Sequence, residues 1–117
     1  MKLAQVKSIL NAKVLTKNAN LDMEYCSACG CDLLSDVLAF VKDHALLLTG
    51  LVNSQVIRTA EMMDISAIVF VRGKVPESSV IEMAEEKNIT LLSTDLPLYL
   101  ACGMLYDNGL MKDSGGK

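Results

Sequence analysis

Three segments of this chain share one pattern: ALLLTG at residues 45–50, AIVFVRG at residues 67–73 and ITLLSTD at residues 89–95. Each begins with an apolar run and ends in a polar turn. The runs recur about every 22 residues, which suits a strand followed by its crossover helix in a parallel sheet. The apolar runs at residues 45–48, 67–71 and 89–92 are therefore predicted to be neighbouring strands.

Apolar residues at helical spacing predict helices in the segments around these strands. We expect helices over residues 3–10, 32–41, 54–63 and 97–109, with Cys31 or Asp32 near the start of the second, and a further helix that begins just after Pro76 and ends at Asn88. Short strands are expected over residues 12–16 and 23–26. The fold class is α/β: a single-domain sandwich of two or three layers, with a mainly parallel central sheet and flanking helices. Residues 1–111 would form this domain, and residues 112–117 a disordered tail.

The bulk composition favours a globular protein with apolar surface left over for an interface. Hydrophobic residues make up 51% of 117 residues and the mean hydropathy is +0.34, yet no apolar run approaches the roughly 20 residues of a membrane helix. Residues 1–7 show no secretion signal, so we expect a cytoplasmic protein. The surplus of apolar residues predicts a subunit interface and a homo-oligomer, a dimer in the simplest case.

The charge distribution argues against nucleic acid as a partner. The net charge is −3, and the chain has two Phe and three Tyr. A nucleic-acid binder needs a basic stripe, and a single-strand binder also needs stacking aromatic residues. Neither feature is present in the sequence.

Polar residues follow each predicted strand, at the edge where α/β sheets hold their ligands. Helix N-termini at this edge favour anions, and an arginine can bind a carboxylate or phosphate with two hydrogen bonds. A small anionic ligand is one hypothesis, and phosphate or a nucleotide would then raise the melting temperature unless Arg72 were changed to alanine. The alternative hypothesis is that these polar residues only form turns and cap helices. The candidate residues are Thr49, Gly50, Arg72, Gly73, Ser93, Thr94 and Asp95.

Three cysteines lie close together at Cys26, Cys29 and Cys31. They suggest zinc or an iron–sulfur cluster as an alternative cofactor, although such sites usually need four ligands. Cys102 or a second subunit could supply the fourth, whereas His44 is separated from the cluster by a predicted helix. A redox pair of Cys26 and Cys29 is a further alternative, and reduced structural thiols are the simplest interpretation.

Catalytic motifs are absent from the sequence. No serine nucleophile elbow is present, and no Gly-x-x-x-x-Gly-Lys-Ser/Thr string could hold nucleotide phosphates for a kinase. His44, the single histidine, suits a helix end. We therefore expect a protein that is not an enzyme. An enzyme that acts on a phosphorylated small molecule is kept as a third hypothesis.

The chain resembles the DRTGG domain family, which is related to the N-terminal domain of HPr kinase/phosphorylase and includes small stand-alone proteins. The resemblance covers most of the chain from about Asp32. It depends on DLLSDVL at 32–38, LTGLVN at 48–53, VIRTAE at 56–61, IVFVRGK at 68–74 and LLST at 91–94.

The resemblance implies a compact α/β sandwich that serves as a regulatory or dimerising module. The Asp-Arg pair of the family name would fall near Leu51 and Val52, and its Thr-Gly-Gly stretch near residues 71–73, so those polar residues are largely replaced. The resemblance and the residue patterns together predict a non-enzymatic, ligand-sensing regulatory module. This module would self-associate and bind a small anionic ligand or a larger protein partner, the alternative being a cysteine-based metal or redox protein.

Overall fold

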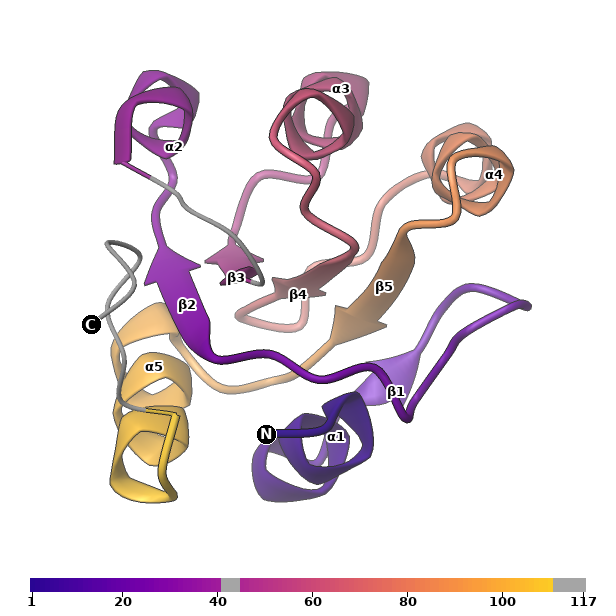
Figure 1. Ribbon diagram of the computed structural model, residues 1–117. Helices are drawn as coiled ribbons and strands as arrows, with labels where there is room; N and C mark the ends of the chain where they lie inside the picture. The colour runs from indigo at the N-terminus through magenta and orange to yellow at the C-terminus, as the bar shows by residue number, and fades with distance from the viewer. Residues whose placement is uncertain (41–44, 111–117) are drawn as a thin grey trace.

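A five-stranded sheet forms the middle layer of the computed structural model, which describes residues 1–40 and 45–110 (Figure 1). Its strands lie in the order β1-β5-β4-β3-β2, and β2 to β5 run parallel, while β1 pairs antiparallel with β5 at the edge. The predicted parallel sheet is confirmed. The strand bounds are β1 (Lys13–Val14), β2 (Ser27–Gly30), β3 (Ala45–Thr49), β4 (Ala67–Phe70) and β5 (Thr90–Ser93).

Helices cover both faces of the sheet, which makes a three-layer sandwich. α2, α3 and α4 lie on one face, and α1 and α5 lie side by side on the other (Figure 1). The described helices are α1 (Leu3–Leu10), α2 (Leu34–Phe40), α3 (Ser54–Met62), α4 (Ser78–Glu86) and α5 (Leu98–Asp107). None of these helices is long and apolar enough to cross a membrane.

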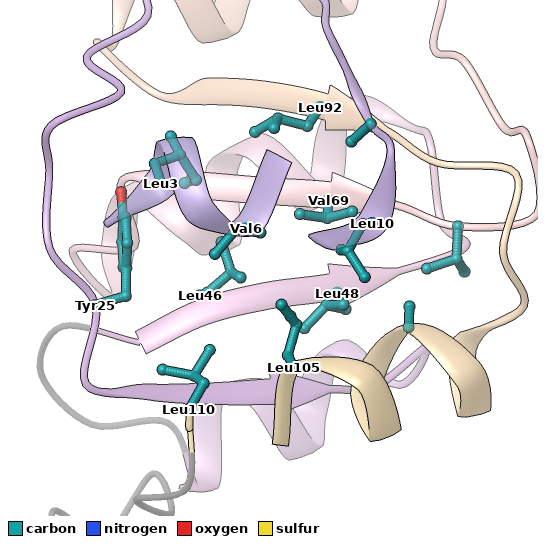
Figure 2. Close-up of a cluster of buried hydrophobic side chains, with 14 residues drawn as sticks. Leu3, Val6, Leu10, Tyr25, Leu46, Leu48, Val69, Leu92, Leu105 and Leu110 are labelled. Carbon is teal, nitrogen blue, oxygen red and sulfur yellow. The ribbon is translucent and has the colours of Figure 1, made fainter. Parts of the chain in front are cut away.

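Alternation along the strands divides the buried residues into two clusters, one under each helical layer. On β3, Leu46 and Leu48 pack toward α1 and α5, whereas Leu47 packs toward α2, α3 and α4. Figure 2 shows the first cluster, in which Leu3, Leu46 and Leu105 come from three different elements. Because each central strand is buried on both faces, its sequence is a continuous apolar run rather than an alternating one.

The predicted strand over residues 23–26 was wrong, since β2 begins at Ser27. The preceding segment instead pairs with the start of the chain. The amide of Leu3 donates to the carbonyl of Met23, the amide of Tyr25 donates to the carbonyl of Met1, and an isolated bridge joins Lys2 to Glu24. The bond from Leu3, with that from the amide of Ala4 to the carbonyl of Leu21, satisfies free N–H groups at the beginning of α1. The segment enters the sheet only after these contacts.

The predicted helix over residues 32–41 begins later and buries less than expected. α2 starts at Leu34, and Val37 is fully buried, but Leu33 is 58% exposed and Leu38 is 43% exposed. The helix lies over the edge strand β2, where the sheet offers too little surface to cover all apolar side chains of the helix (Figure 1). The predictions for residues 41–44, which include His44, and for the tail at residues 112–117 concern residues outside those described.

Candidate functional site

The carboxyl ends of the parallel strands lie along one edge of the sheet. After β4 the chain passes to α4 on one face, and after β5 it passes to α5 on the opposite face (Figure 1). Where neighbouring parallel strands lead to opposite faces, a crevice forms between the two departing loops, and open α/β sheets bind ligands there. The ends of β4 and β5 are therefore the point in this fold where a ligand site is expected.

A pocket of about 170 Å³ opens at this point, and we call it the switch-point pocket. Its volume exceeds that of several waters at about 30 Å³ each and is smaller than the roughly 300–1,000 Å³ of drug-sized sites. The space suits one small group, such as a phosphate or a carboxylate with its immediate neighbours. The pocket is lined by Asn11, Lys13, Leu15, Gly73, Val75, Ser93 and Asp95.

Hydrogen bonds to two backbone carbonyls hold the two sides of the pocket together. The amide of Gly73 donates to the carbonyl of Thr94 over 2.8 Å, and the Ser93 hydroxyl donates to the carbonyl of Lys74 over 2.8 Å. Gly73 adopts a φ of +68°, and a β-carbon there would lie 3.2 Å from Oδ1 of Asp95. Glycine therefore permits both the left-handed turn and the close approach of the Asp95 carboxylate.

A second polar group lies farther along the same edge, around Asp32. Oδ1 of Asp32 accepts hydrogen bonds from the amide of Gly50 at 2.7 Å and from the Thr49 hydroxyl at 3.0 Å. Oδ2 of the same carboxylate lies 3.6 Å from Nη2 of Arg72. We call Asp32, Thr49, Gly50 and Arg72 the Asp32 group.

The Asp32 carboxylate is held in its charged form by this group. The backbone N–H of Gly50 is the main cause of its lowered pKa. Burial opposes it as the next largest effect, and the Thr49 hydroxyl and the Arg72 guanidinium each lower the pKa by less. Arg72 adopts a φ of +58°, and its amide donates to the carbonyl of Leu96. Asp32 thus fastens the ends of β3 and β4 to the segment that follows β2.

The seven candidate residues do lie along this edge, but the structure divides them. Gly73, Ser93 and Asp95 line the switch-point pocket, whereas Thr49, Gly50 and Arg72 belong to the Asp32 group. Thr94 belongs to neither, because it is 2% exposed and its hydroxyl donates to the carbonyl of Leu10 over 2.7 Å. We therefore expect Thr94 to act through the fold rather than through the ligand.

Two charged residues of these sites were missed by the sequence analysis. Lys13 lies on β1, and only the antiparallel pairing of β1 with β5 brings it to the pocket, opposite Ser93 in register. Asp32 was assigned to the predicted second helix. The signal for Asp32 is its position just after β2. The strand predicted over residues 23–26 ends too early to show that position.

The cysteines do not form a ligand set in the described residues. No group of three or more His, Cys, Asp or Glu side chains within residues 1–40 and 45–110 is arranged to hold a metal ion. Burial, and to a lesser extent the nearby Cys31, Cys102 and Asp36, raise the pKa of Cys29 to about 11. Because the thiolate is the form that reacts and binds metals, a redox or metal role for Cys29 gains no support.

Comparisons with known proteins bear on the fold as a whole. The family model of the DRTGG domain matches residues 5–106, which confirms the resemblance predicted from the sequence. No curated protein sequence matches the chain.

Among solved structures, the chain is similar to the CBS and DRTGG domains of the regulatory region of Clostridium perfringens pyrophosphatase, crystallised with the activator diadenosine tetraphosphate. The TM-score is 0.74 at 16% identity, over 89% of this chain and 45% of that one. At this identity the likeness shows the shared fold. This chain spans less than half the length of the similar structure.

Proposed function

Because this chain belongs to the DRTGG domain family, we propose that it is a regulatory module that senses a small anionic ligand in the switch-point pocket. The observation that carries the proposal is the position of this pocket between β4 and β5, whose following helices lie on opposite faces of the sheet. A ligand bound there contacts loops that lead to both helical layers, so its binding energy can favour one arrangement of the whole module.

The chemistry of the lining defines the class of ligand. Lys13 supplies a positive charge for a phosphate or carboxylate, and Asp95 accepts hydrogen bonds from a hydroxyl or amino group of the same ligand. Asn11 adds an amide side chain to the wall. The proposed ligand is therefore a small metabolite with one anionic group and one donor group nearby, or the corresponding part of a nucleotide.

A sensor also needs a surface through which it acts. Large apolar side chains are exposed on the described part of the chain, and on α5 Tyr99 is 85% and Tyr106 58% exposed. Exposed apolar area of this kind marks surfaces that bind other proteins. We infer that the module self-associates and that a larger protein partner receives its signal.

The ligand proposal is tested by thermal unfolding in the presence of inorganic phosphate, AMP, ATP and diadenosine tetraphosphate. A ligand at about a hundred times its dissociation constant stabilises the native state by about 2.7 kcal/mol, which for a domain of this size is a rise of several degrees in Tm. Lys13→Gln should abolish the rise. Lys17→Gln is the matched control, because it removes the same charge from an exposed position outside the pocket.

The Arg72→Ala variant locates the ligand. If the ligand sits in the switch-point pocket, Arg72→Ala keeps most of the stabilisation, because its guanidinium belongs to the Asp32 group. A shift that disappears in Arg72→Ala and persists in Lys13→Gln would move the site to the Asp32 group. The absence of any shift, together with no heat of binding in titration calorimetry, would refute the ligand proposal.

A further inference from the structure

The outer face of α5 is an apolar surface with a glycine at its centre. Tyr99 is 85% exposed, Tyr106 is 58% exposed and Leu100 is 48% exposed, around a shallow groove of about 550 Å³. The opposite side of the helix is buried through Ala101 and Leu105. We call this surface the α5 patch, and it comprises Tyr99, Leu100, Cys102, Gly103, Met104, Tyr106 and Asp107.

The charges of the helix limit what can cover this patch. α5 contains no lysine or arginine, and its one charged residue is Asp107 at the C-terminal end. Helices that dock on membrane surfaces carry basic residues on their polar face, so a lipid surface is a poor match. A partner protein with an apolar face of low charge fits this patch. A second copy of the chain brings such a face, because most of the charges behind its net charge of −3 lie outside α5.

Within residues 1–40 and 45–110, no contact of one chain explains the glycine at position 103. A β-carbon there would meet no atom of these residues within 4 Å. Glycine in the middle of a helix costs about 0.5–1 kcal/mol relative to alanine. A second helix that crosses closely at this point would explain the glycine, because small residues let two helix backbones approach each other.

We propose that the α5 patch binds the same patch of a second copy, with the two helices antiparallel and crossing at Gly103. In such a two-fold arrangement, each residue before Gly103 faces the residue equally far after it on the other copy. Leu100 then faces Tyr106, which pairs two apolar side chains. Tyr99 faces Asp107, so that a phenol hydroxyl can donate to a carboxylate, and the patch is complementary to itself.

The size of the patch predicts a weak dimer. An aromatic side chain buries on the order of 150–250 Å² in total, and these side chains are already partly covered within one chain. The tyrosines of both copies with Leu100 and Met104 therefore stay below the roughly 1,200–2,000 Å² of stable interfaces, in the size range of weak complexes. We therefore expect dissociation in the micromolar range. This inference rests on the proposed self-association and adds to it the surface and the geometry.

Sedimentation velocity on the full chain, from about 1 µM to about 500 µM, tests the surface over the range of weak affinities. The wild type should pass from monomer to dimer with concentration, and Gly103→Glu should weaken the dimer at least about tenfold through charge and bulk at the crossing. Met62→Glu is the matched control, because Met62 is 71% exposed on α3, on the other face of the sheet. Tyr99→Ala tests the surface independently, in case Gly103→Glu reduces folding as followed by circular dichroism.

Cross-linking tests the two-fold geometry. In a background with Cys26→Ser and Cys102→Ala, which removes the exposed thiol and the thiol beside the crossing, Gly103→Cys should form a disulfide with its own copy under mild oxidation. Met62→Cys in the same background should not. A dimer that is insensitive to Gly103→Glu and Tyr99→Ala would overturn the α5 surface and leave the proposed self-association intact. A wild-type chain that stays monomeric at every concentration would overturn both.

Discussion

The Asp32 carboxylate and the Arg72 guanidinium lie 3.6 Å apart at the carboxyl edge of the sheet, and Arg72 extends over the backbone of Gly50, where a β-carbon would collide with its Nη2. The segments that follow three parallel strands, β2, β3 and β4, therefore meet in one polar contact. An arginine that lies across a neighbouring strand end needs a residue without a side chain beneath it, which explains the glycine at position 50.

Gly50→Ala should displace the Arg72 guanidinium and break its pairing with Asp32. Because this pair is nearly half exposed, the expected loss of unfolding free energy is about 1 kcal/mol or less. Urea denaturation of Gly50→Ala measures this loss. In the Arg72→Ala background the same change should cost close to nothing, and an equal loss in both backgrounds would contradict the contact.

The stability that Asp32 contributes should depend on pH in a defined direction. Its pKa is lowered from the usual 3.8 in the folded state, so the contribution is fully present above that value and is lost as the pH falls through the lower, folded pKa. Asp32→Asn should therefore be less stable than the wild type at pH 7, and the difference should shrink below about pH 4. Thermal unfolding of both proteins from pH 2.5 to pH 7 measures it. A difference that grows toward acid would contradict the assignment.

Thr94→Val should cost stability and leave ligand binding unchanged. Its hydroxyl donates to the buried carbonyl of Leu10, and the loss of one partner of a buried hydrogen bond costs about 1–3 kcal/mol. Chemical denaturation measures this cost, and Thr94→Ser, which keeps the hydroxyl, is the control. A ligand whose stabilising shift disappears in Thr94→Val but persists in Thr94→Ser would show that the hydroxyl also contacts the ligand.

The thiols should react at very different rates with an alkylating reagent at pH 7.5. Burial raises the pKa of Cys29 to about 11 and also raises that of Cys102, so little of either is thiolate. Cys26 is exposed and should be modified first. Mass spectrometry of partly labelled protein identifies the order, and labelling in denaturant shows that all four thiols can react. Fast modification of Cys29 would reopen the redox hypothesis.

The parallel sheet was predictable because its signal is local. β3, β4 and β5 are buried on both faces, so each appears in the sequence as a continuous apolar run. β2 was misplaced because Ser27–Gly30 consists of small residues, whereas the preceding segment contains Tyr25, a residue typical of strands. Tyr25 is buried, but in the cluster with α1 and not within the sheet.

The sequence by itself determined which residues lie along the carboxyl edge, since a residue that follows a parallel strand has no other edge to occupy. It did not determine how those residues are grouped. The passage of α5 to the opposite face and the antiparallel pairing of β1 with β5 place Lys13 beside Asp95, and the contact of Asp32 with Arg72 separates a second group. These contacts join residues far apart in the chain, and their energy comes from packing and pairing that exist only once the layers have assembled.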